Sequence, residues 1–211
     1  MIKFRSLFKT LAMATFGISC LVATNVSALT QDQKHTVWQI EQVINTLSTA
    51  QGRFMQIGAN GGIANGNIFI SRPGRIRFEY DPPSPLMIVS DGKYVSQVDK
   101  DLQSVYYKRL SRTPLSFILA DRISLNEAVQ TQDVQFSGNS ILVTVRNRRN
   151  PREGTLTMIF DSHTKELHAW QVIDAQGQMT TVRLQQMSYG LPLDPYLFAR
   201  PEGYKSQNVR D

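Results

Sequence analysis

The sequence predicts a mainly β protein of the α+β class, in which one large curved antiparallel sheet packs against a few short helices. Two observations support this prediction. Apolar and polar residues alternate with a period of two over most of the chain after residue 52. Turn-forming pairs such as Pro73-Gly74, Asp91-Gly92 and Gly138-Asn139 separate the alternating segments by only a few residues, which favours consecutive antiparallel pairing.

Residues 1–28 carry the three parts of a cleavable secretory signal peptide. A basic start is formed by three residues: Lys3, Arg5 and Lys9. Residues 11–23 are uncharged and largely apolar, and Val26-Ser27-Ala28 matches the small-residue pattern of a cleavage site. The apolar run covers about 13 residues, whereas a membrane-spanning helix needs about 20. We therefore expect export from the cytoplasm and cleavage after Ala28, with a single domain over residues 29–211.

Cys20 is the single cysteine of the chain, and a lipoprotein signal that ends there is the alternative interpretation. Gly17-Ile18-Ser19 lacks the aliphatic residue expected three positions before a lipidated cysteine, which disfavours this alternative. Cleavage after Ala28 would remove the thiol. The mature chain is therefore predicted to hold no disulfide, no catalytic thiolate and no cysteine-ligated metal.

The charge of the chain gives little support to nucleic-acid binding. Three of the 23 basic residues behind the net charge of +6 lie in the predicted signal peptide. The remaining arginines gather at two places: Arg72, Arg75 and Arg77, and then Arg146, Arg148, Arg149 and Arg152. We expect solvated strand edges and turns there, with docking patches for anionic lipid or protein as the alternative.

The domain is predicted to open with an amphipathic helix. Thr30 and Gln33 have capping-box spacing. Four apolar residues follow at helical intervals: Val37, Ile40, Ile44 and Leu47. Residues 49–52 are expected to end this helix, and one of its faces must be covered.

Strands are then predicted from the period of two. Their ranges are 53–57, 66–72, 75–80, 86–90, 93–99, 104–108, 132–136, 141–146, 155–161, 167–174 and 179–187. A second, apolar helix is predicted to start at Thr113-Pro114 and to cover residues 115–120, and residues 121–129 are able to continue it. Its apolar side chains need a partner, and the concave face of the sheet is the available one.

No motif for catalysis or for a metal or cofactor stands out. His163 and His168 flank a turn that we interpret as a polar hairpin connection, not as a metal site or a Ser-His-Asp arrangement. The Asp99 and Asp101 pair has no evident apolar pocket that would shift its pKa values. No phosphate-binding, dinucleotide-binding or nucleophile-elbow motif occurs in the sequence. We therefore expect a protein that is not an enzyme and carries no cofactor or metal.

Strand parity places one arginine on a partly apolar face. Ile68 and Ile70 share parity with Arg72, and the next strand turns Ile76, Phe78 and Tyr80 to one side. Two interpretations of Arg72 stay open. It extends into water from a strand end, or it lies in a cavity and donates hydrogen bonds to carbonyl groups at a helix end. In the second case the bonds would form a latch that breaks when a ligand enters.

Several segments together resemble the outer-membrane lipoprotein carrier family, LolA. They are Gly52-Arg53-Phe54-Met55-Gln56, Gly66-Asn67-Ile68-Phe69-Ile70-Ser71-Arg72-Pro73, Asp91-Gly92, Thr113-Pro114-Leu115, Trp170-Gln171 before Asp174-Ala175-Gln176-Gly177, and Leu197-Phe198 before Pro201-Glu202-Gly203. The resemblance implies an unclosed antiparallel β-barrel with short helices as a lid over an apolar cavity. It also implies a soluble periplasmic carrier that takes lipoproteins from an inner-membrane ABC transporter and delivers them to the outer membrane. An outer-membrane lipoprotein acceptor is a candidate partner for delivery.

The resemblance also implies site residues. Arg72 matches the cavity arginine of the family, and Phe78 matches a cavity-lining strand. The expected acyl-binding cavity is formed by Arg72, Ile68, Ile70, Ile76, Phe78 and Tyr80, and the expected lid by Leu115, Phe117, Ile118 and Leu119. The sequence departs from the family where Arg75 and Arg77 make a usually less basic strand more basic. Two other functions stay open: a lipid-binding sensor of envelope stress, and a carrier of a free glycolipid.

Overall fold

The computed structural model describes residues 29–125, 129–147 and 151–207. The predicted signal peptide, Cys20 and the arginines at 148 and 149 lie outside these residues. The helices are α1 (Gln31–Thr46), α2 (Leu115–Ile118) and the 3-10 helices η1 (Leu110–Arg112), η2 (Pro151–Glu153) and η3 (Pro195–Phe198). The strands are β1 (Thr49–Ile57), β2 (Ile63–Ser71), β3 (Arg75–Tyr80), β4 (Leu86–Asp91), β5 (Tyr94–Asp99), β6 (Ser104–Arg109), β7 (Val129–Ser137), β8 (Ser140–Asn147), β9 (Thr155–Asp161), β10 (Leu167–Ile173), β11 (Met179–Tyr189) and β12 (Lys205–Gln207).

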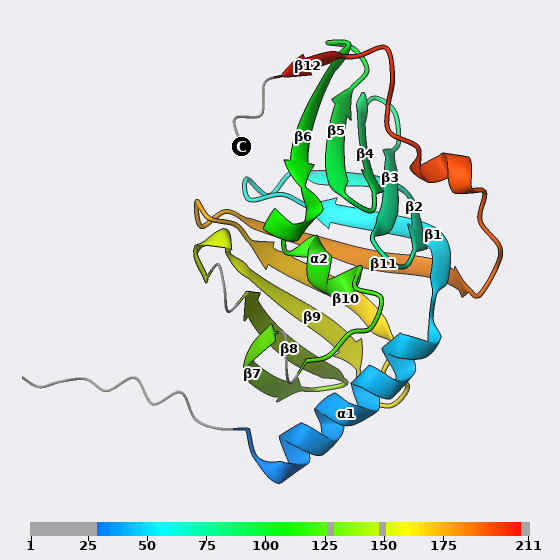
Figure 1. The fold of residues 1–211 in the computed structure, drawn as a ribbon. Coiled ribbons are helices and arrows are strands. Elements are labelled where there is room, and N and C mark those ends of the chain that lie inside the picture. Colours follow the sequence, from blue (N-terminus) through cyan, green and yellow to red (C-terminus); the bar gives the residue numbers. More distant parts are fainter. Residues whose placement is uncertain (1–28, 126–128, 148–150, 208–211) are drawn as a thin grey trace, which may run out of the picture.

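The strands form one open, curved, twelve-stranded sheet (Figure 1) in the order β12-β6-β5-β4-β3-β2-β1-β11-β10-β9-β8-β7. Each half is a meander of neighbouring strands, and the halves join where β1 pairs antiparallel with β11. The pairs along both meanders are antiparallel, while β12 runs parallel to β6. The prediction of a mainly β fold with an unclosed antiparallel sheet is therefore confirmed.

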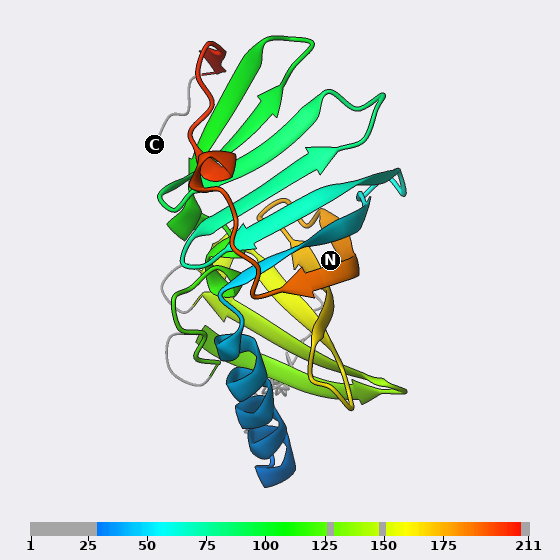
Figure 2. The ribbon, with the colours of Figure 1, turned by 90° about the vertical axis from the view of Figure 1, so that its right-hand side faces the viewer.

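The opening helix has the predicted capping box. The side chain of Thr30 accepts from the Gln33 amide (3.2 Å), and the Gln33 side chain accepts from the Thr30 amide (2.8 Å). Val37, Ile40 and Ile44 are buried against the inner face of the sheet, which is why α1 lies along one half of it (Figure 2). Within the described residues, no helix combines the length and the apolarity needed to cross a bilayer.

Three details of the prediction are wrong. Residues 49–52 do not end the helix, because they already belong to β1. Residues 121–125 do not continue α2 as a helix. Instead, both backbone groups of Ile123 bond to the side chain of Asn45 on α1. The parallel strand β12 was not predicted, because its three exposed residues carry no alternating pattern.

The outer face of β3–β6 is covered by the C-terminal segment (Figure 2), which corrects the expectation that Arg75 and Arg77 are solvated. The Arg75 guanidinium lies 5.8 Å from the centre of the buried Phe198 ring. Arg77 donates to the Leu197 carbonyl oxygen (3.0 Å), and its side chain is only 19% exposed. A second apolar cluster lies on this face and contains Met87, Val89, Val98 and Val105, with Tyr107 and Tyr204 packed against it.

Candidate functional site

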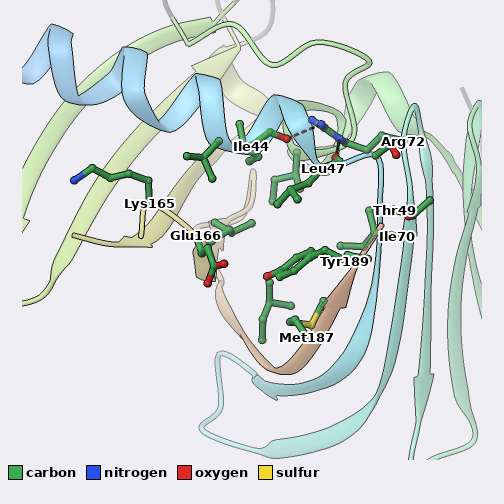
Figure 3. A pocket seen from close by; sticks show the side chains of 15 residues that line it. Ile44, Leu47, Thr49, Ile70, Arg72, Lys165, Glu166, Met187 and Tyr189 are labelled. Carbon is green, nitrogen blue, oxygen red and sulfur yellow. Dashed lines mark hydrogen bonds between the residues drawn. The ribbon is translucent and has the colours of Figure 1, made fainter. Parts of the chain in front are cut away.

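An apolar pocket lies where the C-terminal end of α1 meets the two halves of the sheet (Figure 3). One wall comes from β1 and β2, and the opposite wall comes from β10 and β11. The lining residues are Val43, Ile44, Leu47, Ser48, Thr49, Ala50, Ile70, Arg72, Ile118, Lys165, Glu166, Leu167, Leu184, Met187 and Tyr189. Apolar side chains form most of this surface, so the pocket suits a hydrocarbon group better than a polar one.

Arg72 lies in the wall of this pocket and holds the end of α1 in place (Figure 3). Its Nε donates to the Leu47 carbonyl oxygen (2.9 Å), and its Nη2 donates to the Ile44 carbonyl oxygen (2.6 Å). Ile44 lies in the last turn of α1, where its carbonyl oxygen also accepts from the Leu47 amide (3.3 Å), and Leu47 follows the helix as its C-cap. The helix dipole favours a cation at this end. Nη1 is buried and has no hydrogen-bond partner in the described part of the chain.

The environment of Arg72 disfavours its charge more than an exposed site would. Burial lowers the pKa of the Arg72 guanidinium below its ordinary value, and the negative charge of Asp121 offsets part of this shift. An arginine remains protonated under such conditions, so the pocket holds a partly desolvated positive charge with one nitrogen unsatisfied. A buried donor without a partner costs free energy.

The turn that carries Arg72 also holds both lid helices. The Arg72 amide donates to the Ser48 carbonyl oxygen (2.8 Å), just after α1. The Gly74 amide donates to the Leu119 carbonyl oxygen (2.7 Å), just after α2. The β2–β3 turn therefore connects the ends of α1 and α2 to the sheet.

The residues predicted for the cavity divide into two groups. Ile70 and Arg72 line the pocket. The other four, Ile68, Ile76, Phe78 and Tyr80, are buried in the core beneath it. Phe54 links two of them, since its ring lies 5.1 Å from the rings of both Phe78 and Tyr80 in edge-to-face geometry. These four residues belong to the buried core and do not line the pocket.

The residues predicted for the lid also differ in their positions. Ile118 lines the pocket and is buried. Leu119 is buried in the core, while Leu115 and Phe117 are half-buried against it. The short helix thus contributes one side chain to the pocket and uses the others to pack on the sheet.

A β-bulge in β11 brings in Met187 and Tyr189, which were not predicted to line a cavity. Leu184 faces inward by the period of two, but Gln186 adopts a positive φ of 51° and the register with β1 shifts opposite Gly52. After the shift, Met187 and Tyr189 face inward instead of their neighbours. Gly52 is required there, because a Cβ atom at this position would lie 2.8 Å from the Gln185 carbonyl oxygen and 2.9 Å from the Gln186 carbonyl oxygen. The interval of three between Leu184 and Met187 was the available sequence signal.

A second, more polar pocket continues from the first between β10 and β11. It shares Glu166, Leu167, Leu184, Met187 and Tyr189 with the apolar pocket and adds two polar side chains, His168 and Gln186. The two pockets together form a groove that is apolar at the Arg72 end and polar at the outer end.

The described residues offer little for acid–base or metal chemistry. No group of three or more His, Cys, Asp or Glu residues among them is arranged to hold a metal ion. Burial raises the pKa of the Tyr80 phenol to about 12, and the hydrogen bond from its hydroxyl to Gln56 Oε1 (2.7 Å) opposes this shift. His163 lies in an exposed turn 3.8 Å from the Asp161 carboxylate, away from both pockets. The lining of the first pocket is mainly apolar, which suits the binding of a hydrocarbon group.

Comparison with known proteins identifies several proteins that are similar to this chain. The outer-membrane lipoprotein carrier protein of Alkalilimnicola ehrlichii is 28% identical over 204 residues, covering 92% of this chain and 92% of the relative. An uncharacterized protein of Rickettsia prowazekii is 22% identical over 192 residues, covering 88% of this chain and 89% of the relative. Among solved structures, a LolA superfamily protein from Nitrosomonas europaea has a TM-score of 0.46 at 8% identity, over 82% of this chain and 99% of that one.

One family model matches a long continuous part of the chain. The model described as outer membrane lipoprotein carrier protein LolA matches residues 45–201. This range includes Arg72 and the strands on both sides of the pocket. The chain therefore belongs to the LolA family of outer-membrane lipoprotein carrier proteins.

Proposed function

We propose that this chain is a periplasmic carrier that binds the acyl chains of lipoproteins released from the inner membrane and delivers them to the outer membrane. The observation that carries the proposal is the apolar pocket beneath the end of α1, next to an arginine that holds this end of the helix closed. Membership of the family supports the same function. In this proposal Arg72, Ile70 and Ile118 contact the cargo, and Ile68, Ile76, Phe78 and Tyr80 support them.

The driving force for loading is the removal of hydrocarbon from water. Each buried methylene group contributes about 0.8 kcal/mol, so even one long chain gains several kcal/mol in an apolar pocket. A membrane offers the acyl chain a similar gain. A carrier that releases its cargo must therefore bind it less strongly than the acceptor membrane does.

The hydrogen bonds of Arg72 supply this difference. A chain that enters the pocket displaces the end of α1 and breaks the bonds to Ile44 and Leu47. Hydrogen bonds to charged groups contribute roughly 1.5 to 3 kcal/mol each, so each of the two bonds favours the empty closed state by about one to two powers of ten. Loading must overcome the free energy that favours the closed state, and unloading returns the pocket to that state.

The partners follow from this cycle. Cargo leaves the inner membrane through an ABC transporter of the lipoprotein-releasing type and passes from the carrier to the outer membrane, where a lipoprotein acceptor receives it. No covalent step and no cofactor is needed, since every transfer moves hydrocarbon between apolar environments.

Analysis of the cargo tests the proposal. We expect acylated proteins to co-purify with the carrier from a periplasmic extract, as identified by mass spectrometry. Leu184→Asp places a carboxylate in the pocket wall and should abolish this association, because an unpaired charge is costly in apolar surroundings. Leu191→Asp is the matched control, since Leu191 is 46% exposed and does not line the pocket.

Other outcomes would contradict the proposal. A free glycolipid as the bound molecule would favour a glycolipid carrier. A constant protein partner without any lipid would favour a sensor module. Equal association of acylated proteins with wild type and Leu184→Asp would show that the pocket does not hold the acyl chains.

A further inference from the structure

The antiparallel meander β2–β6 separates its charged turns by the end of the sheet at which they lie. The β2–β3 turn, the β4–β5 turn and the segment from the end of β6 through η1 meet at one end, because successive turns alternate between the two ends. These segments, residues 72–75, 91–94 and 108–113, contain Asp91 as their single carboxylate, and their cations are Arg72, Arg75, Lys93, Lys108, Arg109 and Arg112. The turns at the opposite end, residues 81–85 and 99–103, contain three aspartates and one lysine. The meander is therefore basic at one end and acidic at the other.

Exposed cations form the surface of the basic end, which we name the basic rim and define by Lys93, Lys108, Arg109, Arg112 and Arg200. Arg200 reaches the rim from the C-terminal segment, and its guanidinium lies 4.9 Å from the centre of the Tyr94 ring. The Arg109 guanidinium and the Lys93 ammonium each lie 5.7 Å from the same ring centre. One tyrosine face and edge thus hold three like charges close together. Since Asp91 accepts from Arg200, the rim keeps an excess of positive charge.

The rim is firmly joined to the β2–β3 turn, which connects both lid helices to the sheet. Ser90 is fully buried, and its Oγ donates to the Gly74 carbonyl oxygen (2.8 Å). A Cβ atom at Gly74 would lie 2.7 Å from the Gly92 Cα, so the β2–β3 and β4–β5 turns pack directly on one another. The Gly74 amide in turn donates to the Leu119 carbonyl oxygen just after α2. In Figure 1 η1 and α2 lie at this end of the sheet, so the basic rim and the lid share one end of the molecule.

We propose that the basic rim docks this protein on the surface of an anionic phospholipid bilayer, with the lid end toward the headgroups. The cations of the rim come from three separate segments of the chain, which suits a surface of many phosphates better than a single acidic side chain. Guanidinium groups bind phosphate oxygens through paired hydrogen bonds. Tyr196, which is 84% exposed on the same C-terminal segment as Arg200, adds an aromatic side chain of the kind that is enriched at membrane interfaces.

This docking uses charges on the outside of the protein and does not depend on what the pocket binds, so it goes beyond the proposed function. Each basic side chain near an anionic surface contributes only a modest attraction, and dissolved salt screens it. Docking through the rim is therefore weak, reversible and dependent on ionic strength. A carrier that travels between two membranes needs such a contact, because a strong one would hold it at the first membrane.

Flotation of the cargo-free protein with lipid vesicles tests the inference. One set of vesicles contains only phosphatidylcholine, and the other contains about 30% phosphatidylglycerol in phosphatidylcholine. We expect the partition coefficient at low ionic strength to be at least about tenfold higher on the anionic vesicles. The preference should disappear at about 0.5 M salt, where the screening length is only a few ångströms.

Two triple variants with the same change of net charge locate the contact. The first neutralises exposed cations of the rim: Lys93→Gln, Lys108→Gln and Arg112→Gln. It should bind anionic vesicles at least about fivefold more weakly than the wild type. The matched control neutralises exposed cations outside the rim: Lys100→Gln, Arg183→Gln and Lys205→Gln. The control should bind as the wild type does, and urea denaturation checks that both variants keep the wild-type stability.

The outcomes separate this inference from the proposed function. Equal partition to both kinds of vesicle, wild-type binding by the rim variant, or an equal loss in the control overturns the docking. Binding of a soluble acidic protein without any binding of anionic vesicles also overturns it. Each of these results leaves the binding of acyl chains intact. Docking by a protein from which no acylated cargo can be recovered would support the rim and contradict the proposed function.

Discussion

Arg72 combines two hydrogen bonds to the end of α1 with one nitrogen that has no partner among the described residues. This combination makes the closed pocket favourable without making it rigid. We expect Arg72→Leu to keep the fold and to accept cargo, but to release it at least tenfold more slowly, because the empty state loses the bonds that favour it. The rate of transfer from the loaded carrier to acceptor liposomes measures this effect.

A matched control for Arg72→Leu is Arg183→Leu. Arg183 is an exposed arginine on β11 that lies outside both pockets, so its replacement changes the net charge equally without touching the lid. Transfer at the wild-type rate by Arg72→Leu would show that the hydrogen bonds do not control release.

The sequence predicted the face to which Arg72 points, but it did not identify the residues that surround it. Parity with Ile68 and Ile70 placed it toward an apolar face, because the period of two is a local property of one strand. Its partners Ile44 and Leu47 lie more than two dozen positions earlier, and only the folded chain brings the helix end to the turn. Met187 and Tyr189 were not predicted for another reason. A bulge reverses the alternation of inward and outward side chains along a strand, on which the prediction depends.

At the scale of elements, α1 and the segment 121–125 are held together by side-chain hydrogen bonds. Asn45 Nδ2 donates to the Ile123 carbonyl oxygen (2.8 Å), and Asn45 Oδ1 accepts from the Ile123 amide (2.9 Å). Glu41 accepts from the Leu125 amide at the next turn of the helix. These bonds replace the backbone hydrogen bonds that a helix would have given the segment. The sequence predicted a helix here because the competing partner lies 78 positions away.

We expect Asn45→Ala to lower the free energy of unfolding by about 1 to 3 kcal/mol, because it leaves two half-buried backbone groups without partners. Urea denaturation measures the loss, and faster hydrogen exchange at the Ile123 amide locates it. The control Gln42→Ala changes an exposed position on the same helix and should stay within about 0.5 kcal/mol of the wild type. Equal stability of both variants would mean that α1 is fixed by its apolar face alone.

For the whole molecule, the C-terminal segment acts as a strap over the outer face of the first meander. Arg200 donates to the Asp91 carboxylate (2.7 Å), and its guanidinium lies 4.9 Å from the ring centre of Tyr94. Burial raises the pKa of Asp91, but hydrogen bonds from the Tyr94 and Lys93 amides and from Arg200 outweigh it, so the pKa is lowered overall. The carboxylate is therefore stabilised in its charged form.

The strap should depend on pH with a defined sign. Because the pKa of Asp91 is lowered by folding, its contribution is present above the ordinary carboxyl range and is lost as the pH falls through the lower folded value. We expect Arg200→Ala to cost about 1 kcal/mol near neutral pH, as a largely exposed ion pair with aromatic contacts allows, and to lessen the loss of stability on acidification. Urea midpoints at pH 7 and pH 3 measure both effects. An unchanged difference between the two midpoints would contradict this role.

The seam between β1 and β11 has a consequence for the order of folding. Ala50 pairs with Tyr189, so the contact that joins the halves spans nearly the whole domain, and contacts of such long range form late. The pocket takes Ile70 from one meander and Leu184 from the other. A chain in which only the first meander has folded thus has no pocket to fill, and binding competence arises only with completion of the domain.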